Sequence, residues 1–263
     1  MDRIEACEKK FPQLFGGAKP NAGEGPDPEL MQILQRLIFG EISYTGPLDD
    51  KMRELITCVV LSAYQCLPQL KSHAAAALNT GVTPLELREA VYGCMPFIGC
   101  PKTLNAIGAV NEVFAAKGIA LPLEGAERVP ESERLAAGRA IQEGIYGTEI
   151  RDEFASLPEP FDCELPDVLT GWLFGDFYTR GVLDTKTREL LALVVLEALG
   201  AEAQLGAHVR GCLKCGCTAE EIYSALLHAL PYTGFPLGAN AIRAARQQLD
   251  AVACGPRPSK SVI

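Results

Sequence analysis

A stretch of 67 residues occurs twice in this chain, 135 positions apart, and this duplication constrains the fold more than any other feature. Residues 48–114 align with residues 183–249 without a gap, and 25 of the 67 pairs are identical. The 263-residue chain is therefore expected to hold two units of one fold. The repeated residues that are chemical groups as well as packing groups are an arginine, a glutamate and a histidine: Arg53, Glu54 and His73 in the first copy, and Arg188, Glu189 and His208 in the second.

The pattern within each copy is helical. Asp49 and Asp184 precede segments that begin Lys-x-Arg-Glu, where they are good N-caps. Thr83 and Thr218 each stand three residues before a glutamate, which is typical of a capping box. No segment shows a convincing two-residue alternation of β-branched residues. The predicted fold is all-α, with two tandem units of about five to six helices each.

Composition suggests the boundaries of these units. Residues 1–28 contain several glycines and prolines and are interpreted as an N-terminal arm. The first repeat is predicted over residues 29–117 and a linker over 118–131. The second repeat is predicted over 132–250 and a flexible tail over 251–263.

Charge and cysteine content limit the partners and the compartment. The net charge is −9 without a basic cluster, which argues against a nucleic-acid partner and against an acidic membrane surface. The first ten residues lack the apolar core of a secretory signal, and the apolar run near 190–196 is too short to span a bilayer. Ten cysteines without such a signal favour a reducing compartment, so a cytoplasmic location is predicted. Most of these cysteines are interpreted as packing residues.

The first candidate site lies in the first repeat and combines Cys66, His73 and Glu54. Pro68 favours a helix start, which places Cys66 just outside the N-terminus, where the helix dipole stabilises a thiolate. His73 follows two turns along the same face, and Glu54 belongs to the preceding helix. The alternative is structural: a buried cysteine, a core histidine, and a glutamate paired with Arg53.

The second candidate site lies in the second repeat, where Ala201 replaces the cysteine and a thiol mechanism is absent. Glu202 joins Glu189, Arg188 and His208 in this copy. An arginine can bind a substrate carboxylate while histidine and glutamate move protons, so the set suits acid–base work on an anionic substrate. The alternative is a solvated, charged helix face.

Two further cysteines, Cys94 and Cys100, flank a turn in the first repeat and are redox candidates, although simple packing is the commoner role. A closed zinc site is not expected, because only one Cys-x-x-Cys pair follows His208. Phosphate-binding glycine loops, nucleophile elbows and His-Glu-x-x-His motifs are absent from the sequence, so neither a metal nor a cofactor is predicted.

The segments 174–190, 200–208 and 231–242, together with the Thr218 capping box, resemble the carboxymuconolactone decarboxylase family, which includes the alkylhydroperoxidase AhpD. The first repeat matches over 39–107. The resemblance implies an all-α fold whose single units assemble as trimers or hexamers. A homo-oligomer, as a trimer of fused pairs, is therefore expected.

The family holds two chemistries, and the first is that of thiol peroxidases. AhpD-like members use a Cys-x-x-Cys pair, a histidine and a glutamate, which fall on Cys66, His73 and Glu54 in this sequence. The second cysteine of the pair falls on Gln69. A thiol-dependent peroxidase or disulfide reductase would then need another thiol to resolve the sulfenic acid, and Cys94 or Cys100 is the candidate.

The second chemistry is decarboxylation, which the second repeat resembles more closely, and it is the leading expectation. A small carboxylated substrate of the lactone type would lose carbon dioxide while His208 and a nearby glutamate move protons and Arg188 stabilises negative charge. A third possibility is a non-catalytic assembly protein in which both cavities are vestigial. The residues expected to bind the substrate are Arg53, Trp172, Phe235 and Asn240.

Overall fold

The computed structural model describes residues 1–21 and 23–253, and every regular element in this part of the chain is a helix, which confirms the prediction of an all-α fold with two tandem units. The elements of the first half are α1 (Arg3–Leu14), α2 (Pro28–Gln35), the π-helix η1 (Arg36–Glu41), η2 (Ile42–Tyr44), α3 (Asp50–Tyr64), α4 (Leu67–Asn79), α5 (Pro84–Tyr92), α6 (Met95–Ile98) and α7 (Cys100–Ala116). Those of the second half are η3 (Glu131–Glu133), α8 (Arg134–Tyr146), α9 (Glu149–Phe154), α10 (Phe161–Leu169), the π-helix η4 (Thr170–Tyr178), α11 (Thr185–Leu199), α12 (Glu202–Lys214), α13 (Ala219–Thr233) and α14 (Phe235–Ala253).

The predicted helix starts are confirmed. The side chains of Asp49 and Asp184 each accept a hydrogen bond from a backbone N–H in the first turn of α3 and α11. Thr83 and Thr218 each form a complete capping box at the start of α5 and α13. These local signals are short-range, so the sequence alone is enough to place them.

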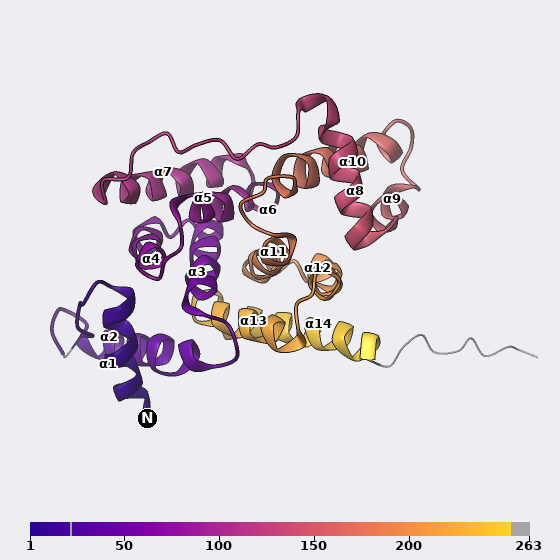
Figure 1. The fold of residues 1–263 in the computed structure, drawn as a ribbon. Coiled ribbons are helices and arrows are strands. Elements are labelled where there is room, and N and C mark those ends of the chain that lie inside the picture. The colour runs from indigo at the N-terminus through magenta and orange to yellow at the C-terminus, as the bar shows by residue number, and fades with distance from the viewer. Residues whose placement is uncertain (22, 254–263) are drawn as a thin grey trace, which may run out of the picture.

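Helices α3 and α11 form the centre of the molecule and pack against each other (Figure 1). Residues 53–63 of α3 and 188–198 of α11 are all buried, and one continuous apolar cluster contains residues of both repeats. The apolar run near 190–196 is therefore a helix enclosed by protein. No helix in the described residues is both long enough and apolar enough to cross a bilayer.

Residues 1–28, interpreted from composition as an arm, contain the helix α1, which packs against η1 as α8 packs against η4. Both helix pairs meet at a glycine: a Cβ on Gly40 would lie 2.0 Å from the Arg3 carbonyl oxygen, and a Cβ on Gly175 would lie 2.8 Å from the Arg134 carbonyl oxygen. The helix α1, in the segment interpreted from composition as an arm, therefore packs in the first half as α8 does in the second half.

Ion pairs confirm that α1 and α8 are equivalent. Arg3 pairs with Glu41 at 3.0 Å, and Arg134 pairs with Asp176 at 3.2 Å. The two arginines are 131 positions apart in the sequence, whereas the two acidic residues are 135 positions apart. The second repeat therefore has four more residues between its arginine and its acidic residue than the first repeat has. This insertion hides the match from an ungapped alignment.

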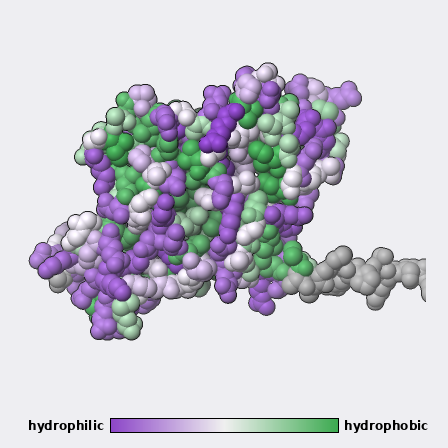
Figure 2. Space-filling view, viewed as in Figure 1, coloured by the Kyte–Doolittle hydropathy of each residue, from purple (hydrophilic) through white to green (hydrophobic). Residues whose placement is uncertain are grey.

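The two copies of this helical layer lie at opposite corners of the molecule, with α1 and α2 far from α8, α9 and α10 (Figure 1). The surface over the N-terminal segment is mostly hydrophilic in this view (Figure 2). Its inner side is apolar, since Cys7 and Leu14 of α1 are buried in a cluster with Ile38 and Phe39. At the other end of the chain, α14 extends to Ala253, so the tail predicted over 251–263 begins within a helix and otherwise lies outside the described residues.

Candidate active site

The glutamate and histidine of each repeat form a buried pair. His73 Nδ1 lies 2.8 Å from Glu54 Oε2, and His208 Nδ1 lies 2.9 Å from Glu189 Oε2. Both histidines are 8% exposed, while Glu54 and Glu189 are 3% and 0% exposed. The structure therefore brings together the glutamate and the histidine within each repeat and keeps the two pairs apart from each other.

A tight reversal of the chain creates each pair. Gln65 caps the C-terminus of α3 and Gly200 caps that of α11, and both residues have left-handed backbone conformations, with φ of 59° and 65°. This conformation ends the helix and turns the chain back, so that α4 and α12 run against the helix that precedes them. The histidine in the middle of the second helix then meets the glutamate near the start of the first.

The second pair is part of a larger network around Glu189. The Tyr146 hydroxyl donates to Glu189 Oε2 at 2.5 Å, and the Tyr178 hydroxyl donates to Oε1 at 2.8 Å. Together with His208, these tyrosines give the buried carboxylate three hydrogen-bond donors. Burial, reinforced by the Glu189 charge, raises the pKa of both tyrosines, so each keeps its hydrogen and acts as a donor.

The network also determines which ring nitrogen of His208 is available. Carboxylate oxygens accept hydrogen bonds, so the tautomer of His208 that donates to Glu189 is the one with its hydrogen on Nδ1. The other ring nitrogen, Nε2, is left without a partner in this network, and the histidine lines the neighbouring cavity. This is the arrangement expected of a histidine that transfers protons.

The first repeat lacks both tyrosines. The counterpart of Tyr146 is Phe15: its ring centroid lies 5.7 Å from that of His73, and the ring centroid of Tyr146 lies 5.8 Å from that of His208. Phe15 also follows Arg3 by the same number of residues as Tyr146 follows Arg134. Ser43 stands 135 residues before Tyr178 and donates its hydroxyl to the carbonyl of Ile38 instead. Glu54 therefore has neither of the tyrosine donors that surround its counterpart.

Each histidine also touches an aromatic ring of the other repeat. Phe97, from the first repeat, lies 5.6 Å from His208 between ring centroids, and Tyr232, from the second repeat, lies 5.8 Å from His73. These residues are again 135 positions apart. The two repeats thus complete each other's sites, and neither site is formed by a single repeat.

A cavity of about 460 Å³ adjoins His208. Its walls come from α8, α9, α10, η4, α11 and α12, with Pro96 and Phe97 as the contribution of the first repeat. Trp172, predicted to bind substrate, lines this cavity together with Tyr146. His73 is instead enclosed by the rings of Phe15, Phe39 and Tyr232.

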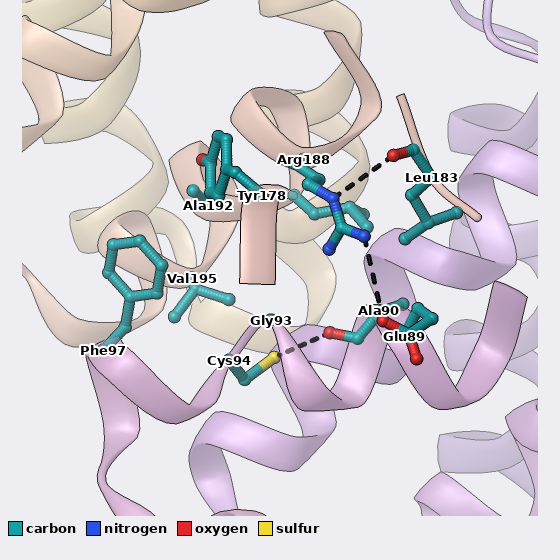
Figure 3. Close-up of a pocket in the computed structure, with 11 residues that line it drawn as sticks. Glu89, Ala90, Gly93, Cys94, Phe97, Tyr178, Leu183, Arg188, Ala192 and Val195 are labelled. Atoms are coloured by element: carbon teal, nitrogen blue, oxygen red, sulfur yellow. Dashed lines mark hydrogen bonds and ion pairs between the residues drawn. The ribbon is translucent and has the colours of Figure 1, made fainter. Parts of the chain in front are cut away.

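The two arginines predicted to contact a substrate bind protein instead. Arg188 donates to the backbone carbonyls of Leu183 and Arg180 and lies 3.7 Å from Glu89, as Figure 3 shows for Leu183 and Glu89. It borders a small cavity of about 20 Å³, room for about one water molecule, and is not among the residues that line the larger cavity. Arg53 likewise donates to the backbone carbonyls of the loop before α3.

Three other predicted residues lie away from the cavity. Glu202 accepts a hydrogen bond from Asn240 at 2.8 Å, and neither lines the cavity beside His208. Six residues of helix turn Glu202 about 120° away from His208 around α12, which explains why the two side chains do not meet. Phe235 is 72% exposed and is also absent from the cavity wall.

The three cysteines predicted for thiol chemistry are not joined to one another by disulfide bonds. Cys66 directly precedes α4, as predicted, but Cys66, Cys94 and Cys100 are all free thiols. Cys94 is buried and donates to the Ala90 carbonyl, and burial raises its pKa to about 12. Within the described residues, no group of three potential ligands is arranged to hold a metal ion.

Sequence reasoning missed the two tyrosines. Tyr178 lies inside the segment that carried the family resemblance, but its counterpart is a serine, so the repeat did not single it out. Tyr146 lies outside the ungapped repeat altogether. An alignment of α1 with α8 that allowed a four-residue gap would have pointed to it through its counterpart Phe15.

Two proteins named as decarboxylases share sequence with part of this chain. Nitrosuccinic acid decarboxylase npaB of Metarhizium robertsii is 33% identical over 99 residues, which are 38% of this chain and 69% of that protein. The 4-carboxymuconolactone decarboxylase of Acinetobacter baylyi is 26% identical over 117 residues, 44% of this chain and 87% of that protein.

A solved structure shows the same fold over nearly the whole chain. It is a Burkholderia xenovorans protein described as a gamma-carboxymuconolactone decarboxylase subunit, with a TM-score of 0.53 and 22% identity, covering 97% of this chain and 99% of that one. The sequence profile of the Carboxymuconolactone decarboxylase family matches residues 28–112 and 164–247, which is more than half of the sequence and falls once in each repeat. The chain belongs to the carboxymuconolactone decarboxylase family.

Proposed function

We propose that this protein decarboxylates a small organic acid in the cavity beside His208, by proton transfer and without a thiol. The observation that supports the proposal is that His208 lines the cavity while its Nδ1 is held by the buried Glu189. Two relatives that share sequence with this chain are named decarboxylases, which points to the same class of reaction.

The reaction has two steps that the site must support. The bond between the substrate carbon and its carboxylate breaks, carbon dioxide leaves, and the electron pair stays on the carbon, delocalised into a neighbouring acceptor group of the substrate. A proton must then be delivered to that carbon. The protonated His208 ring is the donor in this proposal, and it regains its proton from solvent in the next turnover.

Glu189 and Tyr146 position the proton donor. The carboxylate of Glu189 stabilises the positive charge of the protonated ring and keeps its orientation, as the carboxylate does in other histidine–carboxylate pairs. Tyr146 donates to the same carboxylate oxygen and lies 3.1 Å from His208 Nδ1, so it restrains both partners. Neither group needs to change its protonation during the reaction.

The first repeat is proposed to be inactive. His73 is packed among three aromatic rings, and Glu54 lacks the tyrosine donors of its counterpart. The first repeat then serves the second, since it supplies Phe97 to the wall of the active cavity.

A comparison of equivalent histidines tests this proposal. The protein would be mixed with a panel of small β-keto, nitro and enol-lactone carboxylic acids, and carbon dioxide release would be followed by mass spectrometry in D2O. We expect carbon dioxide release and one deuterium on the product carbon that had carried the carboxylate, both abolished in His208→Ala and retained in His73→Ala. Loss of activity only in His73→Ala, or no release from any member of the panel, would contradict the proposal.

A further inference from the structure

The geometry points to a substrate class that the family name alone does not suggest: a mainly apolar ring acid with a single carboxylate, selected against a second carboxylate by the acidic residues of the cavity wall. This inference rests on the proposed function, because it concerns the same cavity. Its basis is the chemistry of the cavity wall.

Most of the wall is apolar. The rings of Phe97, Trp172 and Phe174 and the side chains of Leu165 and Leu169 line the cavity. Its volume of about 460 Å³ is within the range of pockets that bind small ring compounds. Burial of a ring against such a wall is favourable, whereas each polar group of the ligand needs a partner there.

The charged groups of the wall have the wrong sign for a polycarboxylate. Two glutamates, Glu149 and Glu153, line the cavity, and none of the lining residues in the described chain is a lysine or arginine. Arg210 pairs with Glu149 at 2.6 Å and donates to Gln248 at 3.0 Å, so both ends of its guanidinium are occupied. Glu153 takes part in no ion pair within the described residues.

Among the described residues that line the cavity, His208 is the one side chain that can carry a positive charge. Next to His208, a substrate carboxylate meets a ring that is positively charged when protonated. Beside Glu153, which lines the same cavity, a second carboxylate would face another negative charge. A neutral group is tolerated there, and an ammonium group is attracted to it.

The chain carries a built-in reporter for ligand binding. Trp172 is its only tryptophan and lines the cavity, so the intrinsic fluorescence of the protein reports occupancy directly. Binding can therefore be measured for compounds that do not react, independently of carbon dioxide release.

Three ligands with one skeleton test the inference at low ionic strength: phenylacetate, its 4-carboxy derivative and its 4-aminomethyl derivative. We expect saturable changes of Trp172 fluorescence, with the dicarboxylate binding about tenfold more weakly than phenylacetate and the aminomethyl compound at least as tightly. The difference should shrink as salt is added. Equal or tighter binding of the dicarboxylate, or no saturable response to any of the three, would overturn the inference.

Reversal of the charge at Glu153 provides the second test. Glu153→Lys should reverse the order of the two para-substituted ligands, while Glu220→Lys, which makes the same change of net charge on the exposed surface of α13, should leave it unaltered. If the order persists in Glu153→Lys, the inference is wrong. If the predicted order is found but no acid releases carbon dioxide, the substrate class stands and the decarboxylase proposal fails.

Discussion

The Tyr146 hydroxyl lies 2.5 Å from Glu189 Oε2, whereas its counterpart Phe15 brings no hydroxyl to Glu54. The Tyr146 hydroxyl is one of two donors, with that of Tyr178, that distinguish two sites keeping the same glutamate and histidine at nearly the same distance. The duplication thus preserved the pair in both copies, and the surroundings of the pair differ.

Tyr146→Phe is expected to lower kcat by about tenfold to a hundredfold with little change in KM, because the buried carboxylate loses a donor and His208 loses its restraint. Steady-state kinetics on any substrate found in the panel would measure this. The reciprocal change Phe15→Tyr should leave both constants unchanged, and a comparable loss in that variant would assign activity to the first repeat.

Phe97→Ala should reduce kcat/KM by about tenfold, although Phe97 belongs to the first repeat, because it removes part of the wall against His208. The matched variant Tyr232→Ala removes the equivalent ring beside His73. It should lower the melting temperature without changing kcat/KM per folded molecule. Equal kinetic effects of the two changes would argue against a single active site.

Glu197 should make the protein less stable as pH rises. This buried carboxyl accepts from Thr233 at 2.7 Å, its Oε2 has no hydrogen-bond partner among the described residues, and burial raises its pKa to about 8. A raised folded-state pKa gives stability that is complete below the unfolded value of 4.5 and lost as pH rises to about 8, at about 1.4 kcal/mol per pH unit.

Urea unfolding between pH 4.5 and 8.5 checks this expectation. Glu197→Gln should remove most of the pH dependence and be the more stable form above about pH 7, while Glu220→Gln on the surface should behave like the wild type. A wild-type stability that increases over this range, with no difference in Glu197→Gln, would show that the carboxyl is not held protonated.

Cys66→Ser and Cys94→Ser should both leave carbon dioxide release unchanged, because neither thiol lines the cavity beside His208. Cys94 should also resist alkylation at pH 8 in the folded protein, since its pKa is raised to about 12, whereas the exposed Cys100 should react. Mass spectrometry of iodoacetamide-treated protein gives both results. Hydroperoxide consumption that disappears in Cys66→Ser would instead support a thiol peroxidase.

Local sequence signals predicted much of the fold correctly. The N-caps at Asp49 and Asp184 and the two capping boxes involve only residues within four positions of each other, so the sequence alone predicts them. The ungapped repeat identified the glutamates and histidines that pair in the structure, because both members of each pair lie inside the duplicated stretch.

Tertiary structure decided the rest. The direction of a side chain around a helix and the helix opposite to it are set by packing, so Arg188 points to backbone carbonyls and Glu202 points away from His208. Tyr146 joins the site from a helix 43 residues earlier in the chain. The sequence by itself determined a twofold helical chain that repeats a glutamate and a histidine, and only packing decided that the second of these pairs has tyrosine donors and that its histidine lines the cavity of about 460 Å³.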